Sequence, residues 1–272
     1  MIVRELIQRS ASWLADKGFD SARLEAELLL AHVLQTERLR LYVDADKPLQ
    51  DAEVDSFREL LKRRARGEPS AYITRAKEFY GIAFEVTPEV LIPRPETELI
   101  VDRARTLKPA RILDVGTGSG CIAVACAVRL PAAAVVATDI SPAALAVAGR
   151  NAMGAGVSER VEFREGDLLE PIAENERFDL IVSNPPYVAP GAALPEVDLH
   201  EPHQALYAGA DGLDILRRLI PAARSHLADG GTLLVEIGED QAVAVLALAR
   251  PHFAEAAVLP DLAGLPRLLV AS

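Results

Sequence analysis

Residues 111–120 read Arg-Ile-Leu-Asp-Val-Gly-Thr-Gly-Ser-Gly, and this stretch decides the fold. Its first five residues have the length and pattern of a buried parallel strand. The glycines at 116, 118 and 120 allow a tight turn in which the backbone can approach a ligand closely. An apolar, helix-forming segment follows as far as about Arg129. We therefore expect a strand–turn–helix unit of a parallel α/β sheet, with a binding turn at the carboxyl end of the strand.

The chain after this unit keeps alternating between strand and helix patterns. The further expected strands are 134–138, 161–164, 178–182, 232–237, 254–259 and 267–270, with helices over 141–153, 212–227 (kinked or broken near Pro221) and 240–249. Only about eight residues separate the last two strands, too few for a right-handed crossover helix, so these strands should pair antiparallel. The prediction is a seven-stranded, Rossmann-like, doubly wound sheet with its last strand antiparallel.

Residues 1–75 show helical patterns only. One helix should run from Ala22 to about Gln35, and a second from Asp51 to Arg66, ended by Gly67. The apolar face of the first helix is expected to carry Leu24, Leu28, Ala31 and Leu34. The basic last turn of the second helix, 62–66, either complements the helix dipole or belongs to a docking face.

The spacing of apolar residues is no longer helical over residues 76–92, where Glu78 to Val86 fits a hairpin that turns near Gly81. We therefore divide the chain into a small all-α bundle (1–75), a β-hairpin linker (76–92) and a catalytic domain (93–272). The segment Leu91 to Glu98 leads into a helix, with Pro95 at its first position.

Composition restricts the class of protein. The 272 residues contain no apolar run of membrane-spanning length and no signal-peptide pattern, so a cytoplasmic protein is expected. No exposed apolar stripe is left over, so a monomer is expected. Residues 1–75 hold 13 of the 29 basic and 13 of the 40 acidic side chains, so residues 76–272 hold 16 basic and 27 acidic ones. An acidic catalytic part argues against stable nucleic-acid binding. Cys121 and Cys126 are expected to be small buried hydrophobes, and no metal site is expected.

The glycine turn departs from the dinucleotide fingerprint, because Cys121 stands where the third glycine of that fingerprint belongs. Asp114 would also repel a pyrophosphate. An acid followed by three alternating glycines suits a ligand with a cationic amino-acid end, and S-adenosylmethionine has that shape. A purely structural turn is the alternative. The expected cofactor-binding residues here are Asp114, Gly116, Thr117, Gly118, Ser119 and Gly120.

Two further acids follow later strands. Asp139 ends the second strand, where a carboxylate can accept both ribose hydroxyls; the alternative is an ordinary helix N-terminal acid. Asp167 can accept from an adenine amino group, and the backbone of Leu168 can meet the ring edge.

Ser183-Asn184-Pro185-Pro186-Tyr187 follows the strand at 178–182. Neither proline can donate to a strand ladder and both fix φ, so this is a stiff turn at the carboxyl end of a strand. Asn184 offers an amide oxygen, Pro185 a free carbonyl and Tyr187 a flat ring.

Together these motifs resemble the class I S-adenosylmethionine-dependent methyltransferases, and the Asn-Pro-Pro-Tyr stretch resembles the branch that methylates planar conjugated amino groups. With the Leu91–Glu98 segment and the helical N-terminal part, the whole chain resembles the release factor glutamine methyltransferases. Arg75 stands where that family would be expected to have glycine. The resemblance implies class 1 peptide chain release factors as protein substrates and the glutamine of their Gly-Gly-Gln loop as the acceptor.

An amide nitrogen is a poor nucleophile, so the expected catalytic role of Asn184 and Pro185 is to accept both of its N–H hydrogens while charge develops on nitrogen. Pro186 would keep that carbonyl free, and Tyr187 would pack on the amide. The resemblance adds Arg94 and Pro95 to the substrate-binding residues, while His200 and His203 are expected to have loop or substrate contacts. An N6-adenine DNA methyltransferase, a ribosomal-protein glutamine methyltransferase and a non-catalytic binding protein are the alternatives.

Overall fold

The computed structural model describes residues 1–191 and 200–272 of the chain. These residues divide into two compact units, the first built on Met1–Ala76 and the second on 77–191 and Glu201–Ser272. No helix of the described residues is long and apolar enough to cross a membrane.

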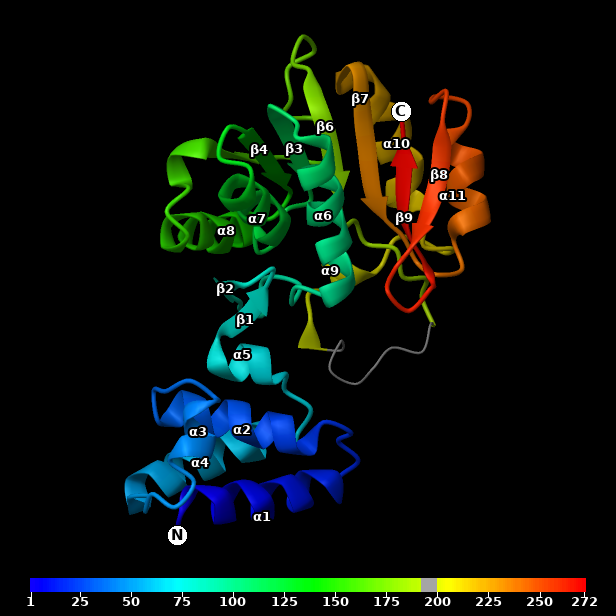
Figure 1. The fold of residues 1–272 in the computed structure, drawn as a ribbon. Helices are drawn as coiled ribbons and strands as arrows, with labels where there is room; N and C mark the ends of the chain where they lie inside the picture. The colour runs from blue at the N-terminus through cyan, green and yellow to red at the C-terminus, as the bar shows by residue number, and fades with distance from the viewer. Residues whose placement is uncertain (192–199) are drawn as a thin grey trace. The chain divides into compact units, whose positions relative to one another are not determined.

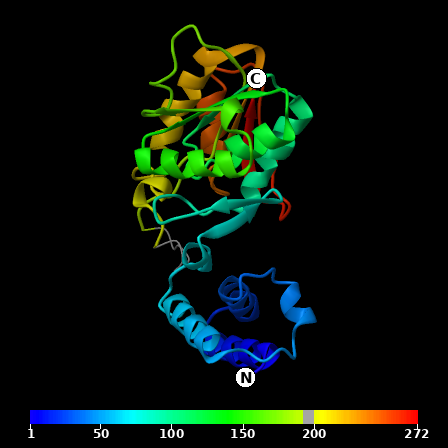
Figure 2. The ribbon, with the colours of Figure 1, turned by 90° about the vertical axis from the view of Figure 1, so that its left-hand side faces the viewer.

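The first unit is helical. Its helices are α1 (Val3–Ala15), α2 (Ala22–Val33), α3 (Arg40–Val43), α4 (Asp51–Arg64) and α5 (Ser70–Thr74) (Figures 1 and 2). Their core contains the fully buried Leu14, Leu29, Leu30 and Phe57. The glycine after α4 takes the left-handed conformation expected of it, with φ of 95° at Gly67.

The predicted apolar face of α2 is right for two of its four residues, because Ala31 is buried and Leu34 packs against the core, and wrong for Leu24 and Leu28. Leu24 and Leu28 are 41% and 38% exposed, and the buried stripe contains Ala26, Leu29 and Leu30 instead. The helix is turned so that Glu27 also faces inward, where it accepts hydrogen bonds from Arg23, Arg38 and Tyr42. Both stripes have helical spacing. The partners of Glu27 outside α2, Arg38 and Tyr42, favour the stripe that turns Glu27 inward.

A hairpin follows the helices, made of β1 (Ala76–Phe79) and β2 (Ile82–Glu85). Its two-residue turn has positive φ at both Tyr80 (54°) and Gly81 (70°), as the sequence predicted for a turn near Gly81.

The second unit contains the predicted seven-stranded sheet. Its strands are β3 (Arg111–Val115), β4 (Ala134–Asp139), β5 (Val161–Glu165), β6 (Phe178–Ser183), β7 (Leu227–Glu236), β8 (Ala256–Pro260) and β9 (Pro266–Ala271). They lie in the order β5-β4-β3-β6-β7-β9-β8, and β9 runs antiparallel to both of its neighbours. The expected pairing of the last two strands is confirmed.

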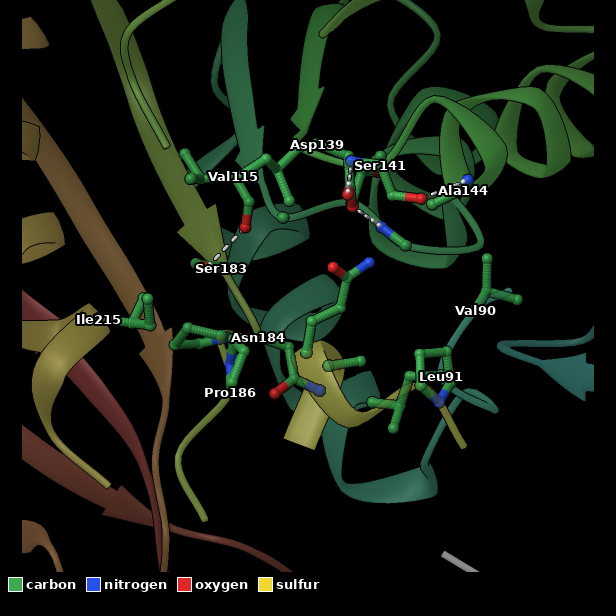
Figure 3. A pocket seen from close by; sticks show the side chains of 18 of the residues that line it. Val90, Leu91, Val115, Asp139, Ser141, Ala144, Ser183, Asn184, Pro186 and Ile215 are labelled. Carbon is green, nitrogen blue, oxygen red and sulfur yellow. Dashed lines mark hydrogen bonds between the residues drawn. The ribbon is translucent and has the colours of Figure 1, made fainter. Parts of the chain in front are cut away.

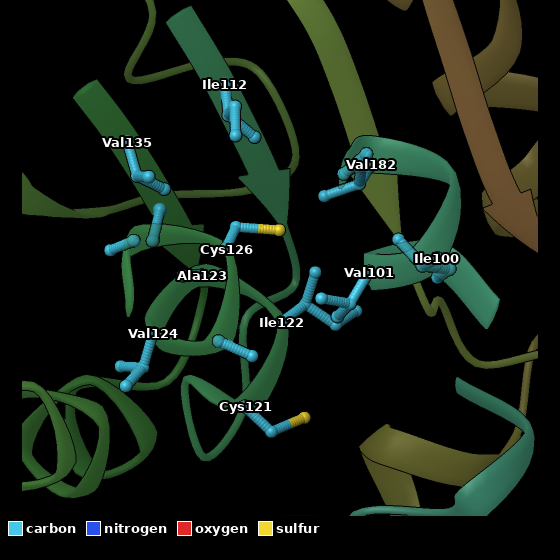
Figure 4. Close-up of a cluster of buried hydrophobic side chains, with 14 of the residues drawn as sticks. Ile100, Val101, Ile112, Cys121, Ile122, Ala123, Val124, Cys126, Val135 and Val182 are labelled. Atoms are coloured by element: carbon cyan, nitrogen blue, oxygen red, sulfur yellow. The ribbon is translucent and has the colours of Figure 1, made fainter. Parts of the chain in front are cut away.

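Helices cover both faces of this sheet (Figures 1 and 2). They are α6 (Glu98–Leu107), α7 (Cys121–Arg129), α8 (Pro142–Gly154), α10 (Asp214–His226) and α11 (Ala242–Ala249). The short helix α9 (His203–Leu206) and the 3-10 turns η1 (Pro95–Thr97) and η2 (Ser158–Arg160) lie in the connections. Alternate residues of the strands pack into two separate cores. Ile112 and Val182 join α6 and α7 on one face (Figure 4), whereas Leu113 and Ile181 join α10 and α11 on the other. Cys121 and Cys126 are free and buried in the first core, as expected.

Two expectations about this unit need correction. Helix α10 is not broken at Pro221, because buried residues on both sides of the proline, including Leu219 and Ala223, hold the helix against the sheet. The next strand was expected to begin at Thr232 but begins at Leu227, so the Gly230-Gly231 pair lies within β7.

Candidate active site

The site lies where the sheet changes winding direction. The chain runs outward from β3 through β4 to β5 and then returns to β6, which pairs with the other edge of β3. Val115 and Ser183 are partners at the ends of these two strands, and the Ser183 hydroxyl donates to the Val115 carbonyl at 2.7 Å (Figure 3). Such a switch point leaves a crevice at the carboxyl ends of the strands. The glycine turn and the Asn-Pro-Pro-Tyr stretch therefore meet there.

A cavity of about 370 Å³ occupies this position. The predicted residues that line it are Gly116, Thr117, Gly118, Ser119, Asp139, Asp167, Leu168, Asn184, Pro185 and Pro186. These residues come from four separate stretches of sequence, which the fold brings to one edge of the sheet. The volume of the cavity is within the range of pockets that bind small molecules.

The backbone of the glycine turn is held in place by hydrogen bonds to the neighbouring strand. The amides of Gly116 and Thr117 both donate to the Thr138 carbonyl at 2.9 Å, which ties the turn to the end of β4. Gly116 and Gly118 have φ of 74° and 55°, the left-handed region that glycine adopts without strain. At Gly120 a Cβ atom would lie 2.9 Å from the Ala148 Cβ, so this glycine allows α7 to pack closely on α8.

Asp114 lies beneath the turn and is not among the residues that line the cavity. Its Oδ2 accepts from the Thr117 hydroxyl at 2.6 Å and from the Ala123 amide at 3.2 Å. Its Oδ1 has no hydrogen-bond partner among the described residues. Burial raises the pKa of this carboxyl to about 7, against the opposing effect of the two hydrogen bonds. The geometry is that of a carboxyl that shapes the turn.

Asp139 lines the cavity at the end of β4. Its two oxygens accept from the backbone amides of Gly118 (2.8 Å) and Ser141 (2.9 Å), as Figure 3 shows. Burial raises its pKa, and these hydrogen bonds oppose the shift. Ser141 caps α8 as predicted, since its hydroxyl accepts from the Ala144 amide. Each carboxylate oxygen retains a second lone pair, so Asp139 can still accept from a ligand.

Asp167 and Leu168, which follow β5, also line the cavity. Asp167 makes an ion pair with Arg218 of α10 at 2.6 Å, and both side chains line the cavity. Leu168 has a positive φ of 53°, and its carbonyl accepts from the Thr138 hydroxyl. Arg218 was missed by the sequence reasoning, because nothing in the local pattern of α10 indicates a partner 51 residues away.

The Asn-Pro-Pro-Tyr stretch presents only its first three residues to the cavity. The Asn184 amide nitrogen donates to the Thr97 hydroxyl at 3.1 Å. The Tyr187 hydroxyl instead donates to Glu236 at 3.3 Å, and Tyr187 is not a lining residue. Burial raises the pKa of the Tyr187 phenol. Val188 continues from this stretch by exchanging backbone hydrogen bonds with Leu206 and Ala208.

The remaining predicted site residues do not line the cavity. Arg94 and Pro95 are not lining residues; Arg94 makes an ion pair with the buried Glu201, which also accepts from the Ile92 amide. His203 stacks on the ring of Tyr207 at 4.1 Å between centroids, and neither His203 nor His200 lines the cavity.

Sequence reasoning missed a second group of lining residues, which lie at the end of the expected linker and directly after it, around α9 and in α10. They are Glu89, Val90, Leu91, Pro93, Pro202, Gln204, Ala205, Tyr207 and Ile215. Their side chains are mostly ordinary apolar ones, so composition gave no signal; only the path of the backbone places them at the cavity.

The fold and this site together define a class, the seven-stranded methyltransferases. Similar folds occur in the hMettl16 catalytic domain (TM-score 0.59, 17% identity, covering 79% of this chain and 82% of that one). They also occur in a T. thermophilus 16S rRNA N2 G1207 methyltransferase solved in complex with AdoMet and guanosine (TM-score 0.56, 20% identity, 72% and 49% covered).

Sequence comparison narrows the class. The family described as the PrmC N-terminal domain matches residues 5–74, and the methyltransferase small domain matches residues 95–200. A release factor glutamine methyltransferase of Geobacter sulfurreducens is 46% identical, with 98% of this chain and 95% of the relative covered. Another, from Cereibacter sphaeroides, is 43% identical, with 100% and 98% covered. The chain belongs to the release factor glutamine methyltransferase family.

Proposed function

We infer that the chain transfers a methyl group from S-adenosylmethionine to the side-chain amide nitrogen of a glutamine in class 1 peptide chain release factors, within the Gly-Gly-Gln motif. The observation that supports this most directly is the position of Asn184, which lines the same cavity as the glycine turn and Asp139. Donor-binding and acceptor-binding groups thus share one space. The relatives that are similar over nearly the whole chain bear the same activity in their names.

The cavity fits the methyl donor. Its walls are largely apolar, as an adenine ring requires, and Asp139 is among the lining residues. We propose that the Asp139 carboxylate accepts from the ribose hydroxyls. Gly116 and Gly118 keep the turn free of side chains where the amino-acid end of the donor would lie. S-adenosylmethionine supplies an electrophilic methyl group on a sulfonium. We propose that Asp167 and Leu168 meet the adenine edge, and that Asp114 acts by holding the turn.

The acceptor amide needs help because its lone pair is delocalised. We propose that the Asn184 Oδ1 and the Pro185 carbonyl accept its two N–H hydrogens and so stabilise the positive charge that develops on nitrogen. A turn bond to that carbonyl would come from the amide of Val188, and this amide donates to the Leu206 carbonyl instead. The N-methylated amide cation would lose its surplus proton readily to solvent, so no strong base is required and catalysis would consist mainly of positioning.

The roles proposed for Tyr187, Arg94 and Pro95 change with the geometry. The Tyr187 hydroxyl is held by Glu236 and Arg94 is paired with Glu201. We therefore propose that they stabilise the walls of the acceptor site, with Pro95 starting the 3-10 turn that places Thr97 beneath Asn184.

The decisive experiment incubates the protein with labelled S-adenosylmethionine and, separately, a release factor, a ribosomal protein fraction and DNA. Mass spectrometry should locate one added methyl group, about 14 Da, on a single glutamine of the release factor. Label in DNA alone, or in a ribosomal protein alone, would replace this function with one of the two alternatives. Asn184→Ala should keep donor affinity and lose most of the turnover. Loss of donor affinity with unchanged turnover per complex would contradict the acceptor role.

We further propose that the first unit docks the release factor, and that exposed basic side chains at the end of α4 contribute. Replacing Lys62 and Arg66 with Glu should raise KM for the intact release factor and leave KM for a short glutamine peptide unchanged. Lys47→Glu, an exposed charge reversal in the same unit, is the matched control. Equal changes of KM for both substrates would exclude this docking face.

The excess of acidic side chains in residues 76–272, 27 against 16 basic ones, supports a protein partner over stable nucleic-acid binding. We propose a monomer that acts in the cytoplasm. Light scattering of the purified chain should give a mass near 29.2 kDa, and a dimer mass would contradict this.

A further inference from the structure

Two walls of the cavity come from separate stretches of the chain. One wall is the glycine turn, in which Ser119 is a lining residue. The other is the segment Glu89–Leu91, which follows the hairpin. Val90 and Leu91 of this segment are drawn with Asp139 around the cavity in Figure 3. A ligand that contacts both walls binds more tightly if their separation is already fixed before it arrives.

Asn151, on α8, connects the two walls without lining the cavity itself. Its side chain belongs to a residue that is only 6% exposed. The Asn151 Oδ1 accepts from the Glu85 amide at 2.7 Å, and the Nδ2 donates to the Glu85 carbonyl at 3.0 Å. The same Nδ2 donates to the Ser119 carbonyl at 2.8 Å. One buried side chain therefore joins the last residue of β2 to the glycine turn.

The Asn151 amide can make these three hydrogen bonds in one orientation only. Its nitrogen faces two carbonyl oxygens, which need its two hydrogens, and its oxygen faces a backbone N–H. An amide turned by 180° would place its oxygen against both carbonyl oxygens. Buried hydrogen bonds of this kind are costly to remove, so the amide holds its partners firmly.

The connection from Glu85 to the cavity wall is short and buried. Residues 86–88 separate Glu85 from Glu89, and Val86 and Thr87 are 0% and 7% exposed. The Val90 amide donates to the Thr87 carbonyl at 3.1 Å, which closes a tight turn at the start of the wall. A displacement of Glu85 is therefore transmitted to the segment Glu89–Leu91.

We propose that Asn151 is a positioning residue for the methyl donor: its amide holds the segment Glu89–Leu91 at a fixed separation from the glycine turn. This inference rests on the proposed function, in which the turn receives the amino-acid end of S-adenosylmethionine. The donor then binds between walls that are already in place, and the cost of ordering them during binding is avoided. The three hydrogen bonds of Asn151 do not reach Asn184, so the residue should control donor affinity and not methyl transfer.

The first test needs no methyl transfer. Asn151→Asp changes the shape of the side chain least; it keeps an oxygen for the Glu85 amide but has no hydrogen for the two carbonyls. In calorimetry with S-adenosylhomocysteine, the donor without its methyl group, the Kd should rise about tenfold to a hundredfold. Asn175→Asp, the same change at an exposed asparagine of the second unit, is the matched control and should retain the wild-type Kd. An unchanged Kd in Asn151→Asp would overturn the inference.

Urea unfolding separates positioning from a general loss of stability. Global unfolding raises the apparent Kd only by the inverse of the folded fraction. Asn151→Asp protein that is folded in the absence of urea, and still binds weakly, has lost the preformed site. A rise in Kd that the unfolded fraction accounts for in full would overturn the inference.

Kinetics with a release factor give a second distinction. In Asn151→Asp the KM for S-adenosylmethionine should rise by the same factor as the Kd. The kcat at saturating donor and the KM for the release factor should stay within about twofold of the wild type. A lower kcat with an unchanged KM for the donor would contradict the positioning role.

Arg150→Gln shows whether any attachment of Glu85 is sufficient. Arg150 is the neighbour of Asn151, and its Nε pairs with the Glu85 carboxylate at 2.8 Å where both side chains are partly exposed. Exposed pairs of this kind contribute little, so the Kd should change by less than about threefold. If Arg150→Gln weakens donor binding as much as Asn151→Asp, the hydrogen bond to Ser119 is not what matters, and the inference fails.

A measurement on the wild-type protein decides if Asn151→Asp does not fold. Glu85 does not line the cavity, but its amide is hydrogen-bonded to Asn151. Because Asn151 joins this amide to the turn, bound S-adenosylhomocysteine should slow hydrogen exchange at Glu85 together with exchange in the glycine turn. Slower exchange in the glycine turn alone would overturn the inference.

These outcomes separate the two proposals. Calorimetry and hydrogen exchange decide the role of Asn151 even if the protein methylates no glutamine, which would contradict the proposed function alone. Conversely, Asn151→Asp protein that methylates the release factor with the wild-type KM for the donor overturns the inference and leaves the proposed function intact.

Discussion

Gly212 and Gly230 offer a matched test of how closely the backbone approaches itself behind the acceptor site. Both have φ of 73°. A Cβ atom at Gly230 would meet nothing within 4 Å, whereas one at Gly212 would lie 2.2 Å from the Tyr187 carbonyl oxygen. Gly230→Ala should therefore show only the left-handed backbone penalty, about 1–2 kcal/mol of unfolding free energy.

Gly212→Ala has the same penalty and a clash. Ordinary contact begins at 3.4 Å, so the two atoms must separate by roughly 1 Å, and overpacking of this kind costs a further ~1–3 kcal/mol. The Tyr187 carbonyl should move, and the Asn-Pro-Pro stretch with it. A displacement of about 1 Å at a catalytic group lowers kcat on the order of a hundredfold. Gly230→Ala should retain wild-type kcat.

The assay is urea unfolding followed by circular dichroism, together with kcat on a release factor. The single tryptophan, Trp13, lies in α1 of the first unit, so its fluorescence reports the unfolding of that unit. The urea transition followed by this fluorescence should be the same in both variants. Equal loss of stability in the two variants, or a wild-type kcat in Gly212→Ala, would refute the argument from close approach.

Three other substitutions test separate features. Arg75 has φ of 57° at the end of α5, so Arg75→Gly should raise the unfolding free energy by about 1 kcal/mol, measured by urea unfolding; a loss of stability would show that the side chain contributes more than the strain costs. Asp114 has a folded pKa of about 7 against an ordinary 3.8, so its contribution to stability is complete below pH 4 and is lost as pH rises through 7. Relative to Asp114→Asn, the wild-type protein should lose up to about 4 kcal/mol between those pH values; parallel stability curves would contradict the buried charge. Asp139→Ala leaves the amides of Gly118 and Ser141 without their acceptor and should weaken S-adenosylmethionine binding at least about tenfold in calorimetry, whereas unchanged affinity would remove Asp139 from the donor site.

Sequence reasoning was strongest where a local backbone requirement dictates the residue. Gly116, Gly118, Gly67 and Gly81 have the positive φ that their turns need, and Ser141 caps the helix that it precedes. It was weakest where two local patterns compete. The stripe with Leu24 and the stripe with Leu29 both fit a helix, and Pro221 was expected to kink or break a helix that tertiary packing keeps continuous.

The sequence by itself determined the order of strands and helices, the antiparallel last strand, the glycine turn and the stiff Asn-Pro-Pro turn, because each depends on periodicity or on φ within a few residues. It also determined which residues have the chemistry for a donor and an amide acceptor.

Only the tertiary structure decided which of those residues face the cavity. Asp114 and Tyr187 belong to the motifs yet do not line the cavity, while Val90 and Arg218 line it without belonging to any motif. Which buried partner satisfies a polar group depends on residues far apart in sequence, as with Thr97 beneath Asn184, 87 positions later. Such pairs depend on the long-range pairing of β6 with β3 in the sheet, and no local sequence pattern encodes that pairing.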